Sequence, residues 1–110
     1  MESILTSIKK LLGITDEYEH FDQDIVMHIN SVFTDLRQIG VGPEEGFFIE
    51  DETSVWTDFI TEPGKMESVK TYMYLRVKLL FDPPTSSSVI ESINRQIEKF
   101  EWRLNVAAES

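Results

Sequence analysis

The chain has 110 residues, 41% of them hydrophobic, and carries 20 acidic against 10 basic side chains. This length and composition predict a single folded domain over residues 1–110, and the lack of cysteine excludes disulfides, thiolate catalysis and cysteine-based zinc sites. Residues 1–64 hold 14 acids and 3 bases, whereas residues 65–110 hold 6 acids and 7 bases. The acidic excess of residues 1–64 argues against a DNA-binding surface and against docking on an anionic membrane.

Apolar residues at helical spacing predict two helices before residue 40. The first, over about 2–12, ends at Gly13, which suits a C-cap, and its apolar residues are Ile4, Leu5, Ile8, Leu11 and Leu12. The second, over about 20–39, has one longer apolar stripe made of Phe21, Ile25, Ile29, Val32, Leu36 and Ile39. The acids between the two stripes suit a helix N-terminus.

Residues 40–64 have no sustained helical period, yet they are too apolar for an idle loop. "FFIE" is compatible with a short extended piece. "DETSVWTDFI" is compatible with a helix of one or two turns capped by Asp51 or Thr53. A segment this long and aromatic in a small domain usually has a function of its own.

Two further helices are predicted, over about 65–81 and 88–106. The first is apolar or aromatic around nearly its whole circumference, which predicts a central place in the core. Asp82-Pro83-Pro84 ends it, and Ser88 with Glu91 fits a capping box for the next helix. The two helices therefore form an antiparallel hairpin. The predicted fold is all-α, a small bundle of four main helices with a long, partly irregular loop between the second and the third.

Two polar clusters invite a chemical interpretation. His20, Asp24 and His28 follow i, i+4 spacing and would present ligands for a metal-dependent enzyme, but no further ligand cluster stands out, so solvated helix-face residues are the favoured interpretation. Acids at positions 50, 51, 52 and 58 lack the spacing of a calcium loop, and helix capping with solvation explains them better. Without a nucleophile motif or phosphate loop, the sequence predicts no enzyme and no cofactor.

The aromatic residues outside the stripes leave two interpretations open. Trp102 lies off the stripe of the last helix, so it either covers a neighbouring helix or anchors a protein interface. Phe47, Phe48 and Trp56 pose the same choice. A core of this size is not expected to bury both groups.

The order of these features resembles a known family. "SIKKLLGIT", then a helix and a middle loop, "Y-x-x-x-R-x-x-L-L-F-D-P-P" and "SSSVIESINRQIEKFEWRLN" resemble the small head-tail connector proteins, also called adaptor or head-completion proteins, of long-tailed bacteriophages and prophages. The resemblance implies a non-enzymatic subunit that forms a ring of roughly a dozen copies beneath the portal protein after DNA packaging. It also implies that the ring extends the DNA channel and holds a stopper or tail-completion protein. The place of action would be the head-tail interface of the virion, reached from the host cytoplasm during assembly.

The resemblance assigns roles by position. The hairpin would be the rigid wall of each subunit, and the end of the last helix would dock on the portal. The expected subunit or partner contacts are Phe47, Phe48, Trp56, Phe59, Trp102, Leu104 and Val106. The acids expected to include channel-facing groups, past which DNA moves without specific binding, are Glu44, Glu45, Glu50, Asp51 and Glu52. The competing hypothesis is a small acidic protein-binding regulatory module; neither hypothesis has a membrane partner.

Overall fold

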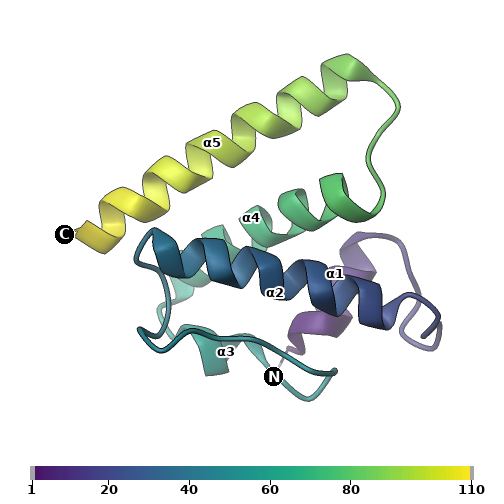
Figure 1. Ribbon diagram of the computed structural model, residues 1–110, viewed down its shortest axis with the longest axis horizontal. Helices are drawn as coiled ribbons and strands as arrows, with labels where there is room; N and C mark the ends of the chain where they lie inside the picture. Colours follow the sequence, from purple (N-terminus) through teal and green to yellow (C-terminus); the bar gives the residue numbers. More distant parts are fainter. Residues whose placement is uncertain (1, 110) are drawn as a thin grey trace.

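Helices form the regular structure of this chain (Figure 1). The computed structural model describes residues 2–109, and within them there is no β-strand, only an isolated bridge between Ser3 and Val55. The helices are α1 (Ile4–Leu11), α2 (Asp22–Gln38), α3 (Trp56–Phe59), α4 (Pro63–Phe81) and α5 (Ser87–Glu109). The predicted fold class, four main helices with an irregular segment between the second and third of them, is confirmed.

A buried lysine joins α1 to the start of α2. Lys9 is only 2% exposed, and its ammonium lies 2.8 Å from Asp22 Oδ1 and donates to the Asp16 carbonyl oxygen at 3.0 Å. Asp22 and Asp24 occupy the first turn of α2, where negative charge is favourable. Asp22 therefore both suits the N-terminus of α2 and neutralises a cation that burial would otherwise disfavour.

Helix α4 is the centre of the bundle and packs against α1, α2 and α5. Its buried side chains are Val69, Tyr72, Met73, Leu75 and Val77. They point in several directions around the helix, as the apolar circumference of its sequence predicts. Pro63 occupies the first turn, where its missing N–H costs nothing.

The corner after α4 sends α5 back antiparallel to it (Figure 1). Helix α5 begins at Ser87, and the residue before it acts as the cap: Ser86 Oγ accepts from Val89 N at 3.4 Å and the Ser86 carbonyl from Ile90 N at 3.1 Å. The predicted capping box of Ser88 with Glu91 is therefore wrong by two positions, since the cap is Ser86 and Ser88 already lies inside the helix.

A polar network fastens three helices together. Arg76 of α4 contacts Asp35 of α2 at 2.5 Å and donates to the Tyr72 hydroxyl at 2.6 Å, and that hydroxyl donates to Glu101 of α5 at 2.7 Å. Burial raises the pKa of Tyr72, and the hydrogen bond to Glu101 raises it further. The network fixes how α5 lies on α4 beyond what apolar contact alone specifies.

No helix in the described part of the chain combines the length and the apolar character needed to cross a lipid bilayer.

Candidate interaction surfaces

The irregular segment 40–62 is attached to the core by aromatic rings. Phe47 and Phe59 pack on Phe33 of α2 with ring centroids 5.0 and 4.6 Å away, and 5.3 Å from each other. Gly42 has φ +92°, and a Cβ there would lie 2.3 Å from the Phe59 ring. Glycine is therefore required at this position both for its backbone angle and for the close approach of the ring.

A single asparagine holds the extended piece of this segment against α2. Asn30 Nδ2 donates to the Ile49 carbonyl oxygen at 2.9 Å, and Ile49 N donates to Asn30 Oδ1 at 2.7 Å. Ile49 is thereby turned inward and is 1% exposed, whereas its neighbour Phe48 is 68% exposed. The alternation is that of extended backbone, although "FFIE" pairs with no strand.

Trp56 belongs to the core. It is 2% exposed, and its indole Nε1 donates to Ser7 Oγ at 2.8 Å. Helix α3 starts at this residue and is capped by the Asp58 carboxylate, which accepts from Val55 N at 3.0 Å, and not by Asp51 or Thr53.

Three of the expected contact residues are consequently reassigned: Trp56, Phe59 and Leu104 are buried within the chain that carries them. Phe59 closes the ring cluster with Phe33, and Leu104 lies on the face of α5 that packs on α4. Phe47 is partly buried in the same ring cluster, so the exposed members of the expected set are Phe48, Trp102 and Val106.

The outward face of α5 carries the largest bare side chain of the C-terminal half. Trp102 is 67% exposed and Val106 43% exposed. Arg95 and Lys99, also exposed, precede them at i, i+4 spacing and so lie on the same side of the helix. Ile97 and Leu104 occupy the opposite side and are buried, so the helical period alone places Trp102 outward.

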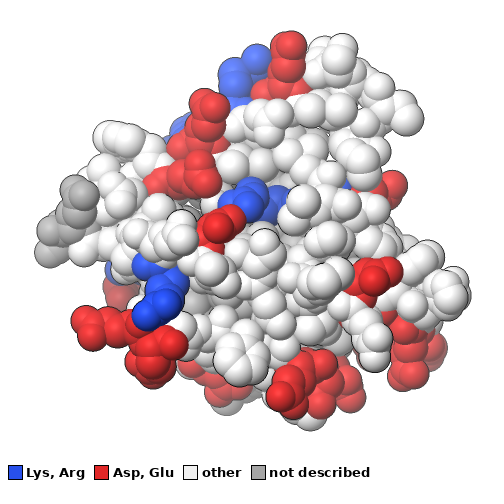
Figure 2. Space-filling model, in the orientation of Figure 1, with Lys and Arg blue, Asp and Glu red and all other residues white. Residues whose placement is uncertain are grey.

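The expected channel acids are all exposed, namely Glu44, Glu45, Glu50, Asp51 and Glu52. Asp51 accepts from both the Thr53 hydroxyl and the Thr53 N–H, and these two bonds hold the pKa of its carboxyl below the usual value. Figure 2 shows more acidic than basic groups along the edge where segment 40–62 lies, and both signs along α5.

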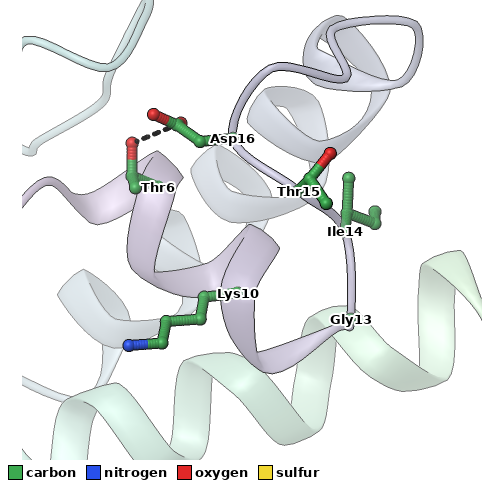
Figure 3. Close-up of a pocket in the computed structure, with 6 residues that line it drawn as sticks. All are labelled: Thr6, Lys10, Gly13, Ile14, Thr15 and Asp16. Carbon is green, nitrogen blue, oxygen red and sulfur yellow. Dashed lines mark hydrogen bonds between the residues drawn. The ribbon is translucent and has the colours of Figure 1, made fainter.

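The hollow drawn in Figure 3 does not gather polar groups around one point. It has a volume of about 320 Å³ between α1 and the turn that follows it. Thr6 and Asp16 face each other across it, with Thr6 Oγ1 donating to Asp16 Oδ1 at 3.2 Å, whereas Lys10 extends away on the other side of α1. This arrangement closes the turn and holds no ligand-shaped set of donors.

The histidine cluster does not form a single helix face. His20 precedes α2 and packs its ring on Phe21, with centroids 4.9 Å apart, whereas Asp24 and His28 lie within the helix. Among residues 2–109, no group of three or more His, Cys, Asp or Glu side chains is arranged to hold a metal ion.

The fold and its surface define a class of protein: a small helical unit whose distinctive exposed features are charged and aromatic patches suited to contacts with other proteins. A protein-family model described as a phage connector protein matches residues 4–110, so the chain belongs to the phage connector family. Phage connector proteins are structural components of the virion and contact other phage proteins. Neither the search of curated proteins nor that of solved structures found a match.

Proposed function

We propose that this chain is a subunit of a ring that lies beneath the portal protein, extends the DNA channel and offers an attachment surface to a stopper or tail-completion protein. The observation that carries the proposal is the connector-family match over residues 4–110, nearly the whole chain. Assembly would take place in the host cytoplasm before the ring becomes part of the particle. The ring would hold roughly a dozen copies.

The fold supplies a suitable wall for such a ring. Helices α4 and α5 are antiparallel and are joined through Tyr72, Arg76 and Glu101. A stiff pair of helices resists deformation when the particle is filled with DNA under load. Phe48, Trp102 and Val106, the exposed members of the expected contact set, would meet neighbouring proteins of the assembly. Phe47 is partly buried in the ring cluster of Phe33 and Phe59.

The charge suits a passage for DNA. Each copy carries a formal charge of -10, and a ring multiplies that charge around its channel. DNA is itself densely negative, so acidic groups lining the passage would keep it from sticking. Glu44, Glu45, Glu50, Asp51 and Glu52 would include the channel-facing groups.

Measuring particle size separates this function from its competitor. The purified chain is sized alone and after mixing with the cognate portal protein, and the mixture is imaged by electron microscopy. A ring of definite symmetry on the portal is the expected result. A monomer or dimer that ignores the portal and captures a basic protein would instead favour the small acidic regulatory module.

The channel role has its own test. Glu44→Lys/Glu45→Lys changes the charge by four units at exposed positions, and the Arg37 bond here is to the Glu44 carbonyl rather than to its side chain. Assembled particles carrying this variant are expected to retain DNA on ejection. Unchanged DNA ejection would show that Glu44 and Glu45 do not face the channel.

A further inference from the structure

Two exposed patches of this chain have opposite character. The acidic patch consists of Phe48, Glu50, Asp51 and Glu52 on the irregular segment, and the basic patch consists of Arg95, Lys99, Trp102 and Arg103 on α5. Each contains one aromatic side chain that is about two-thirds exposed: Phe48 at 68% and Trp102 at 67%. Bare aromatic rings surrounded by charge are typical anchors of protein interfaces.

Among residues 2–109, the charges of both patches have no ionic partner. In the described residues, none of Arg95, Lys99 and Arg103 is in an ion pair, although Lys9, Lys65, Lys70, Arg76 and Lys78 all are. Glu50 and Glu52 likewise make no ion pair or side-chain hydrogen bond in the part of the chain that the structure describes. Helix α5 holds four acids against these three bases, so its charge is mixed. Glu101 is bonded to Tyr72, whereas Glu91 and Glu98 are exposed beside the bases.

The patches lie at opposite edges of the molecule. Figure 1 shows α5 along one edge and segment 40–55 along the other, with α2 and α4 between them. Glu50, Asp51 and Glu52 lie beside Gln23 near the start of α2, whereas Asn105 of α5 donates to the Ile39 carbonyl just beyond the end of α2 at 3.4 Å. Because α5 and segment 40–55 lie on opposite edges, the acidic patch does not face the basic patch of its own chain.

Two copies that met through the same patch would place like charges against each other, which is unfavourable. A contact between different patches places acids against bases and one bare ring near the other. Because such a contact is head-to-tail, its repetition generates a closed ring when the rotation between copies permits.

We propose that the acidic patch of one copy docks on the basic patch of the next copy, and that this contact builds the ring. The proposal rests on the connector function above and specifies the partner of the α5 face as a second copy of this chain, not the portal. Glu44 and Glu45 lie outside the contact, near the C-terminal end of α2, where Arg37 holds the Glu44 backbone. Along α2, Arg37 and Gln23 are about 20 Å apart.

A charge-reversal cycle tests the pairing. Glu50→Lys/Glu52→Lys and Arg95→Glu/Lys99→Glu are each expected to weaken assembly of the full-length chain by roughly tenfold or more. All four substitutions in one chain restore the complementarity and are expected to recover most of the loss. Glu44→Lys/Glu45→Lys is the matched control, with the same charge change on the same segment and assembly retained. Sedimentation velocity alone and with portal gives the readout, and circular dichroism checks folding.

Trapping with cysteine gives a second readout that does not depend on strong association. The chain has no cysteine, so Glu52→Cys and Lys99→Cys introduce the only thiols. Under mild oxidation, a mixture of the two variants is expected to form a disulfide-linked dimer, while each variant alone stays unlinked. The variant carrying both substitutions is expected to give a ladder of linked multimers.

The outcomes separate the two proposals. Rings that form normally from both reversal variants would overturn the head-to-tail contact and leave the connector function standing. Loss of portal binding by Arg95→Glu/Lys99→Glu with self-association intact would overturn it also, because the portal would then be the occupant of the α5 face. No assembly of the unsubstituted chain, alone or with portal, would overturn both.

Discussion

Two regions of this protein carry aromatic residues that the helical pattern does not explain, and the structure treats them differently. In segment 40–62, Trp56 and Phe59 turn back into the core and Phe48 alone is left largely bare. On α5, Trp102 stays outside although the helix packs closely on α4.

The difference lies in how backbone geometry fixes direction. A helix rotates each residue by a known angle, so Trp102 must point away from the side that buries Ile97 and Leu104. An irregular segment has no period, and each of its side chains goes where local bonds take it. Asn30 turns Ile49 inward and thereby Phe48 outward. Bare aromatic residues can therefore be assigned to a surface from sequence on a helix, but not on such a segment.

Replacing the two tryptophans in turn is the strongest test of this comparison. Trp56→Ala is expected to lower the free energy of unfolding by about 3–5 kcal/mol, because it leaves a cavity and removes the donor to Ser7 Oγ. Trp102→Ala is expected to change it by less than about 0.5 kcal/mol, because the ring is mostly solvated. Urea unfolding followed by far-ultraviolet circular dichroism measures both.

Assembly should rank the two tryptophan positions in reverse. Trp102→Ala is expected to weaken ring formation while folding normally, and Trp56→Phe, which keeps most of the core volume, is expected to assemble. Equal loss of stability from Trp56→Ala and Trp102→Ala would contradict the assignment of Trp56 to the core and of Trp102 to the surface.

The attachment of the irregular segment is expected to depend on Asn30. Asn30→Ala removes both partners of the Ile49 backbone and leaves a buried N–H and C=O unsatisfied, at a cost of about 2 kcal/mol. Faster hydrogen exchange at the Ile49 amide would show local release of the segment. Ser31→Ala, an exposed neighbour on the same helix, is the control and should leave that exchange rate unchanged.

The sequence was sufficient for the parts of the fold that periodicity governs. The apolar circumference of the helix over 65–81 predicted its central place, and Asp82-Pro83-Pro84 predicted the corner. Asn30 was missed because a lone asparagine on a helix face has no pattern that distinguishes a backbone clamp from a solvated side chain. The same lack of pattern hid the burial of Trp56, since its bond to Ser7 joins positions 49 residues apart. His20 was assigned to α2 because the i, i+4 spacing continues one step beyond the helix itself.

The bond between α4 and α5 predicts a dependence on alkaline pH. The pKa of Tyr72 is raised in the folded chain by burial and by the hydrogen bond to Glu101, so its neutral form contributes stability that is complete below about pH 10 and falls as the pH rises further. Tyr72→Phe is expected to lower the free energy of unfolding by about 1 kcal/mol at pH 7. Above pH 10 the unsubstituted chain is expected to lose up to about 1.4 kcal/mol per pH unit through Tyr72, and this loss should be absent in Tyr72→Phe.

Urea midpoints between pH 7 and 11 for both chains measure this effect. The stability difference between the unsubstituted chain and Tyr72→Phe should stay constant up to about pH 10 and shrink above it. Tyr74→Phe, also on α4, is the control for removing a tyrosine hydroxyl at pH 7. A difference that stays constant with pH would show that Tyr72 does not link α4 to α5 through its proton.

The smallest expected effect concerns where α5 begins. Ser86→Ala removes the hydroxyl that caps Val89 N and is expected to cost about 0.5 kcal/mol, at the low end for a cap because the bond is 3.4 Å long. Ser88→Ala loses only an exposed contact with Ser86 and should be closer to neutral. A larger loss from Ser88→Ala would restore the capping box with Glu91 that the sequence suggested. Paired urea titrations resolve the order, and because the cap lies far from Trp102, neither variant should alter assembly.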